Sequence, residues 1–171
     1  MSNVRVKKRN GSIEPMNLEK MHVMVERACK DLAGVSASQV EMQSGIQFYN
    51  GITTDEIQGI LIKSASDLIS LEQPNYQYVA ARLLLFSLRK SLYGKIYEIP
   101  HLKDHIDRCI DYGVYDPTVN DKFTVGEINE LEKYLDHDRD YLFTYAGLRQ
   151  VADKYLVPVS YTHLRAHETS L

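Results

Sequence analysis

The stretch that decides the fold is residues 53–68, which read TTDEIQGILIKSASDL. Thr53 stands three residues before Glu56, which is the spacing of a capping box at a helix start. Behind this start, apolar or small side chains recur every three or four residues and would share one helix face. These residues are Ile57, Ile60, Leu61, Ser64 and Leu68. The stretch therefore predicts an amphipathic helix that buries one face against other elements.

Three more amphipathic helices are expected near this one. They cover residues 17–34, 36–45 and 75–92. The first would be capped by Asn17, the second would open with a capping box formed by Ser36 and Gln39, and the third would stop at Gly94. Four helices with short connections predict a small four-helix bundle.

A small β-sheet is expected to cover one end of this bundle. Residues 4–8 and 12–16 flank Asn10-Gly11, a pair that tolerates the positive φ values of a type I′ hairpin turn. Residues 46–49 are a candidate third strand. The predicted fold class is therefore mainly α, of the α+β type.

A second helical unit is expected after Gly94. Helices are predicted over residues 100–112, 125–135 and 146–156, and a capping box at Thr124 and Glu127 opens the middle one. Residues 158–171 continue no such pattern. The expected domains are therefore residues 1–95 and 96–157, followed by a tail over 158–171.

Composition places the chain among ordinary globular proteins. Of its 171 residues, 44% are hydrophobic and 25% are charged. No apolar stretch approaches the roughly 20 residues of a membrane-spanning helix, and the N-terminus does not resemble a secretory signal, so a cytoplasmic location without membrane contact is expected. Cys29 and Cys109 lack the CxxC spacing of a zinc ribbon.

Charge is unevenly distributed along the chain. Residues 1–30 hold seven Lys or Arg against three Glu, whereas residues 101–140 hold eleven acidic residues against five basic ones. This distribution favours a local anion site near the start of the chain, but not general binding of nucleic acid.

The best candidate for that anion site is the corner between the hairpin and the first helix. Lys8 and Arg9 lie at the turn, Glu14 lies across the hairpin, and Asn17 and Lys20 lie in the first helical turn, where free backbone N–H groups favour anions. A phosphate group fits this corner. The alternative is a solvated hairpin that carries ordinary surface cations.

Two further residues are candidates for the same site. Lys90 extends the apolar stripe of the helix at 75–92, so it would face the end of the bundle, although a lysine that reaches toward the last carbonyls of its helix explains it equally well. Thr54 offers a hydroxyl and a backbone N–H at a helix start, but helix capping alone is also sufficient.

Other polar clusters are weaker candidates. His101 and His105, and likewise His163 and His167, have one-turn spacing but no nearby third ligand, so no metal site is expected. The charged run at residues 137–140 is expected to be an ion-paired helix junction. The sequence has no P-loop, no GxGxxG motif and no set of nucleophile, base and orienting residue.

Several motifs closely resemble the ATP-cone of ribonucleotide reductases. They are VKKRNGSIEPMNLEK at 6–20, FYNGITTDEI at 48–57 and YVAARLLLFSLRK at 78–90. The resemblance continues through YLDHDRD at 134–140, FTY at 143–145 and KYL at 154–156. These later motifs are similar to the helical segment that follows the cone in the large (alpha) subunit of aerobic class I ribonucleoside-diphosphate reductase. The resemblance covers about residues 4–157.

The resemblance implies an allosteric switch. In that family ATP permits turnover and dATP suppresses it, by changing how the large-subunit homodimer and the radical-generating small subunit assemble, and the nucleotide binds with Mg²⁺. By position, Lys8, Arg9, Thr54 and Lys90 would meet phosphates, and Glu14, Asn17 and Lys20 would line the base and sugar. Val6, Met21 and Phe48 would form apolar walls.

The resemblance also has limits. The family's ten-stranded catalytic barrel with its redox cysteines is not in this sequence, so the chain is expected to be an N-terminal fragment that reduces no ribonucleotide alone. Residues 160–169 resemble translated adapter sequence, so a non-native tail is expected over 158–171. One alternative is the cone of a transcriptional repressor of reductase genes, but it would need a four-Cys zinc ribbon before the cone, and the two scattered cysteines and the resemblance past residue 124 argue against it. A second alternative is a helical interaction module without a ligand.

Overall fold

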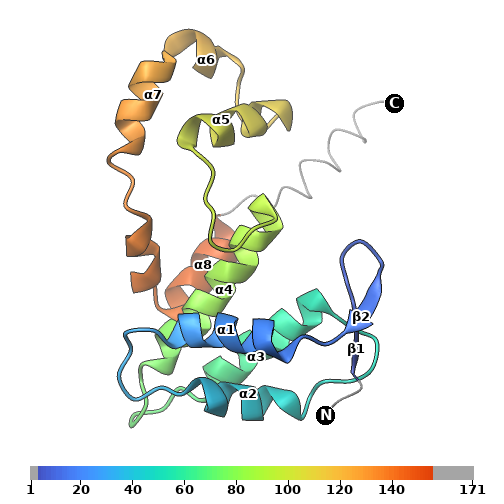
Figure 1. The fold of residues 1–171 in the computed structure, drawn as a ribbon. Coiled ribbons are helices and arrows are strands. Elements are labelled where there is room, and N and C mark those ends of the chain that lie inside the picture. The colour runs from blue at the N-terminus through green and yellow to red at the C-terminus, as the bar shows by residue number, and fades with distance from the viewer. Residues whose placement is uncertain (1–3, 156–171) are drawn as a thin grey trace.

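Helices dominate the computed structural model, which describes residues 4–155, and a three-stranded sheet lies at one side (Figure 1). The elements are β1 (Arg5–Lys7), β2 (Ile13–Pro15), α1 (Leu18–Cys29), α2 (Ala37–Gly45), β3 (Ile52–Thr53), α3 (Thr54–Asp67), α4 (Tyr76–Tyr93), α5 (Leu102–Asp111), α6 (Thr118–Lys122), α7 (Val125–Glu132), the 3-10 helix η1 (His137–Leu142) and α8 (Tyr145–Lys154). The prediction of a mainly α fold with a small sheet is confirmed. The expected tail over 158–171 lies outside the described residues.

Helix α3 begins at the predicted capping box. The Thr53 hydroxyl accepts a hydrogen bond from the Glu56 backbone N–H at 3.1 Å, and the Glu56 carboxylate accepts one from the Thr53 N–H at 2.8 Å. The same reciprocal pair is present at Thr124 and Glu127 before α7. These local hydrogen bonds explain why both helix starts could be predicted.

The predicted capping box at Ser36 is wrong. Helix α2 does begin at Ala37, but the Ser36 side chain makes no capping hydrogen bond. Instead the Ser36 N–H donates to the hydroxyl of Tyr76 at 3.0 Å, and the Gln39 side chain also bonds this hydroxyl. Because Tyr76 is fully buried, its hydroxyl needs polar partners, and it takes the groups that the box would have used.

The third strand lies at Ile52–Thr53, so the prediction of a strand at 46–49 is wrong. Strand β1 is central, with β2 antiparallel on one side and β3 parallel on the other, so that Val6 pairs with both Glu14 and Ile52. Ile52 is fully buried whereas Ile46 is 84% exposed. Burial of Ile52 beside Val6 therefore favours the later strand.

The hairpin turn also differs from the predicted type I′ turn. The Lys8 N–H donates to the Ser12 carbonyl, and the Gly11 N–H donates to the Lys8 carbonyl at 2.9 Å. Gly11 has a φ of +85°, whereas Asn10 does not have a positive φ. The loop therefore has three residues, a type I turn closed by a left-handed glycine. This loop projects Arg9 from the hairpin.

Helix α4 packs on both of its faces. One face joins α1, α2 and α3 around a core that includes Val25, Leu61 and Phe86. The other face, through Leu84 and Leu85 among others, packs on Leu148 of α8, and α4 also contacts η1. Helices α5, α6 and α7 lie apart at the top of the view in Figure 1.

Helix α4 thus packs against the other three N-terminal helices and also against the segment that follows them. Within residues 4–155, no helix is long and apolar enough to cross a membrane.

Candidate functional site

An open pocket of about 570 Å³ lies where the hairpin, α1, the start of α3 and the end of α4 meet. It is lined by Val6, Lys8, Met16, Asn17, Glu19, Lys20, Met21, Val23, Met24, Thr54, Ile57, Gln58, Lys90, Ile96 and Tyr97. Seven of the ten residues named from the sequence line this pocket. Arg9, Glu14 and Phe48 do not.

Local structure explains why distant parts of the chain converge here. The Asn17 side chain accepts a hydrogen bond from the Lys20 N–H at 2.8 Å and so begins α1 directly after the hairpin. Thr54 is the first residue of α3, and Lys90 is in the last turn of α4, which ends at Gly94 with φ +72°. The free N–H groups at the start of α3 add partial positive charge at this end of the pocket.

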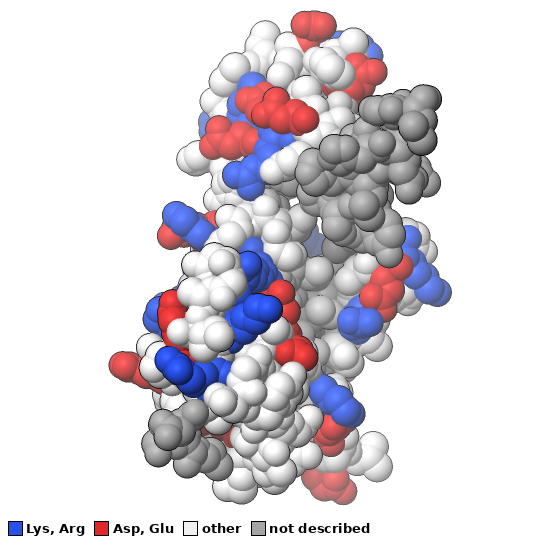
Figure 2. Space-filling view, turned by 90° about the vertical axis from the view of Figure 1, so that its right-hand side faces the viewer, with Lys and Arg blue, Asp and Glu red and all other residues white. Residues whose placement is uncertain are grey.

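Positive side chains gather around Lys90. Partial burial lowers the pKa of Lys90, and the positive charges of Arg9, Lys8 and Lys20 lower it further, while Asp55 acts in the opposite direction. Figure 2 views the molecule from the hairpin side and shows Lys and Arg side chains clustered with several acidic ones on its lower half. Such a cluster favours binding of an anion, because an anion relieves the mutual repulsion of the cations. We call this end of the pocket, at Lys8, Thr54 and Lys90, the phosphate end, after the group predicted there from the sequence.

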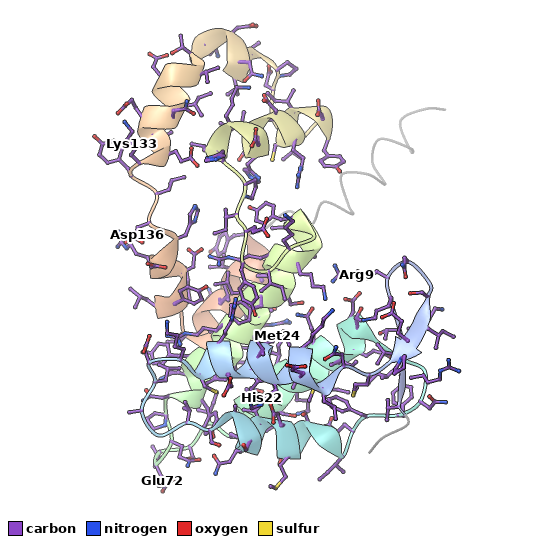
Figure 3. The ribbon with its side chains drawn as sticks, in the orientation of Figure 1. Arg9, His22, Met24, Glu72, Lys133 and Asp136 are labelled. Carbon is purple, nitrogen blue, oxygen red and sulfur yellow. The ribbon has the colours of Figure 1, made fainter. Side chains whose placement is uncertain are left out.

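Arg9 lies at the rim of the phosphate end and is already paired. Its Nε and Nη2 donate to one carboxylate oxygen of Asp55 at 3.0 and 2.7 Å, and its Nη1 donates to the Lys90 carbonyl at 3.3 Å. Figure 3 shows Arg9 between the hairpin and the neighbouring ends of α3 and α4. The guanidinium is therefore next to the pocket, but it is held by an acid.

Glu14 and Phe48 lie elsewhere. The Glu14 carboxylate is 3.4 Å from the ammonium of Lys8 and does not line the pocket. Phe48 lines a neighbouring groove between α1 and α2, together with Met42 among others. Met16, Glu19 and Met21 line both the pocket and the groove, so Phe48 lies in a cavity that adjoins the pocket but does not line the pocket itself.

Another part of the pocket is apolar. Met24, Ile57, Ile96 and Tyr97 contribute to it, together with Met21. The guanidinium carbon of Arg27 lies 4.0 Å from the centre of the Tyr97 ring. Phe86 makes an edge contact with the same ring, and the two ring centres are 5.5 Å apart. An apolar wall with an aromatic ring suits a planar organic group. We call this part the apolar end.

Gln58 is a buried polar residue of the same pocket. Gln58 is 5% exposed, and among residues 4–155 its amide nitrogen reaches only the Met24 sulfur, at 3.8 Å. Its amide oxygen has no hydrogen-bond partner among the described residues. A buried carbonyl oxygen without a donor is costly in the empty protein and available to a ligand that brings one.

Sequence reasoning missed Gln58, Met24, Ile96 and Tyr97 as pocket residues. Gln58 lies three residues before Leu61, on the predicted apolar face of this helix, and a polar residue on that face was a usable signal. Ile96 and Tyr97 lie in an irregular segment after Gly94, where no periodic spacing of apolar residues indicates which way the side chains point.

The other clusters do not form sites. His101 pairs with Glu132 at 3.0 Å, whereas His105 contacts Cys109, and burial lowers the pKa of His105. No group of three potential metal ligands occurs within residues 4–155. Asp140 binds Arg89, as expected of an ion-paired junction. His163 and His167 lie outside the described part of the chain.

Comparison with known families identifies the N-terminal half. The ATP cone domain family matches residues 4–91, which is more than half of the chain. The chain belongs to the ATP cone domain family. The matched segment contains all the residues that form the phosphate end of the pocket.

Relatives extend the similarity beyond the cone. The chain is 46% identical over 155 residues to ribonucleoside-diphosphate reductase 1 subunit alpha of Escherichia coli, an alignment that covers 91% of this chain and 20% of the relative. It is 45% identical over 152 residues to the Haemophilus influenzae subunit alpha, covering 89% of this chain and 20% of that protein. The subunit alpha of Enterobacteria phage T4 is 48% identical over 126 residues, which is 72% of this chain and 17% of the phage protein. The cone-bearing chain thus spans about a fifth of the length of these relatives.

Proposed function

We propose that this chain is the N-terminal regulatory part of a ribonucleoside-diphosphate reductase large subunit, and that its pocket binds ATP or dATP. The observation that carries this proposal is the pairing of a cationic phosphate end with an apolar end inside the segment that matches the ATP cone. Residues 1–95 would form the cone, with Ile96 and Tyr97 completing its pocket. Residues 96–157 would begin the next helical domain.

The pocket suggests how a nucleotide would lie. Its phosphates would meet Lys8, Lys90 and the start of α3 at Thr54, where charge-assisted hydrogen bonds are available. The base would lie against Met21, the rest of the apolar end and Val6, while Asn17 and Lys20 would approach the sugar and base from α1. Arg9 would join the phosphates after it leaves Asp55, and Glu14 would need to turn away from Lys8. Phe48 would act only through its neighbours in the groove.

Magnesium would enter with the nucleotide. Mg²⁺ keeps several waters and commonly binds phosphate oxygens with one or two carboxylates, so it needs no site built entirely from protein ligands. We therefore propose a complex of Mg²⁺ with ATP or dATP as the effector.

The regulatory role is proposed from the relatives. In the complete large subunit, ATP would activate and dATP would inhibit the reduction of ribonucleotides to deoxyribonucleotides, which supply DNA synthesis. The state of the cone would be read by the large-subunit homodimer and the small subunit. We propose that the chain alone binds the effector without catalysing reduction.

Isothermal titration of the full chain with Mg-ATP tests this proposal. We expect saturable heat in the wild-type chain and, for Lys90→Ala, an affinity lower by about tenfold to a hundredfold, because a charge-assisted contact contributes about 1.5–3 kcal/mol. Lys63→Ala is the matched control, since Lys63 is exposed and pairs only with Asp67. No heat at millimolar ATP would overturn the proposed function. Equal affinities of the two variants would remove Lys90 from the site.

A further inference from the structure

Asp55 occupies an unusual position beside the phosphate end. It follows Thr54 in the first turn of α3, next to Glu56, whose carboxylate is used by the capping box. The Asp55 carboxylate takes no part in that box and instead accepts two hydrogen bonds from Arg9 through a single oxygen. Both side chains are largely solvent-exposed, at 61% for Asp55 and 41% for Arg9.

The carboxylate also acts on the pocket itself. Among the charged groups that influence the pKa of Lys90, Arg9, Lys8 and Lys20 are positive and Asp55 is negative. An arginine fork binds a phosphate or a carboxylate with the same geometry, so the two anions are alternatives for one guanidinium. A phosphate at Lys90 would thus lie close to a like charge on Asp55.

We propose that Asp55 is the counter-ion of Arg9 at the phosphate end, and that the phosphates of a bound nucleotide compete with it for Arg9. This inference rests on the proposed function and adds that Asp55 makes the site select nucleotides by the number of their phosphates. A nucleoside triphosphate is long and charged enough to displace the carboxylate and gain Arg9. A monophosphate that stops at Lys90 leaves the Arg9–Asp55 pair in place.

Titration of Asp55→Asn with ATP and AMP, in the full chain, tests the inference. The variant keeps the shape of the side chain but loses its charge. We expect ATP to bind about three- to tenfold more tightly. Release of Arg9 from an exposed ion pair contributes little, and loss of the repulsion between Asp55 and several phosphate charges adds to that contribution. The gain should be smaller than twofold for AMP and should shrink as NaCl is raised.

Two variants serve as controls. Asp67→Asn removes an acid from the same helix that pairs with Lys63, so ATP affinity should not change. In an Arg9→Ala background, Asp55→Asn should give less than half of its gain, because the guanidinium for which the anions compete is absent. Melting temperatures close to that of the wild type would show that the variants are folded.

The outcomes separate the inference from the function on which it rests. If the wild-type chain binds ATP and Asp55→Asn binds it equally or more weakly, the counter-ion role is wrong and the nucleotide site stands. The same conclusion follows if Asp67→Asn tightens binding as much as Asp55→Asn. Absence of ATP binding by the wild-type chain would overturn the proposed function and this inference with it.

Discussion

Replacement of Gln58 by methionine should stabilise the empty protein and weaken nucleotide binding. Gln58 is buried, and its amide oxygen has no hydrogen-bond donor in the described structure. Methionine has nearly the same length, an equal helix propensity and no polar oxygen to desolvate. The substitution therefore removes a cost to folding without opening a cavity.

The structure sets the size of both effects. A buried, unpaired carbonyl costs about 1–3 kcal/mol, and part of this is recovered when an apolar group of similar shape replaces it. We expect a gain of about 1–2 kcal/mol in the free energy of unfolding, which raises the melting temperature by about 2–8 °C in a chain of this size. A lost neutral hydrogen bond to the ligand should weaken ATP about two- to tenfold.

Thermal melting without nucleotide and calorimetric titration with ATP measure the two effects. Ser64→Ala is the control, because Ser64 is also buried in α3 with an unpaired hydroxyl but does not line the pocket. This control should be stabilised with unchanged ATP affinity. A Gln58→Met variant that melts below the wild type, or that binds ATP equally well, would refute the reasoning.

Two further predictions concern stability. Asp140→Asn leaves Arg89, whose side chain is 8% exposed, without its counter-ion at 2.7 Å, and we expect unfolding to become easier by about 1–3 kcal/mol because Asp140 itself is partly exposed. The half-exposed pair of Arg149 and Asp153 is the control. If Asp140→Asn lowers the free energy of unfolding no more than Asp153→Asn does, the prediction is contradicted. Hydrogen bonds from Thr53 hold the pKa of Glu56 below its ordinary 4.5, so this carboxylate stabilises the fold above that pH and the contribution is lost as pH falls through the lowered pKa. Melting from pH 6 to pH 3 should show a smaller loss of stability in Glu56→Gln than in the wild type, and identical profiles would contradict the assignment.

Local signals allowed much of the fold to be predicted. The capping boxes at Thr53 and Thr124, the cap at Asn17 and the stop at Gly94 each depend on hydrogen bonds or φ values within a few residues, and all four are confirmed. Two of the errors arose where a distant partner decides the outcome. Tyr76 takes the polar groups near Ser36. Arg82 of α4 donates to the Ala28 and Lys30 carbonyls, where the first helix ends at Cys29, before the predicted stop at Gly34.

The candidate site shows the same division. Lys8, Thr54 and Lys90 could be predicted because each lies at a turn or a helix end, where cations and free backbone N–H groups favour binding of an anion. Charge alone did not reveal that Arg9 is paired with Asp55, because the two residues are 46 positions apart. Tyr97 lines the pocket and contacts Arg27 and Phe86, and no periodic pattern in the sequence indicates these contacts.

The methionine methyl groups offer the most direct test of a nucleotide in this pocket. Met16, Met21 and Met24 line it, and of these three Met24 does not also line the neighbouring groove, where Met42 lies and is 75% exposed. In the full chain labelled with ¹³C at the methionine methyls, Mg-ATP should shift the Met24 signal and those of its two pocket neighbours with one saturation curve, while Met42 stays unchanged. An unchanged Met24 signal at saturating ATP, or an equal shift of Met42, would contradict a nucleotide bound between the hairpin and α1.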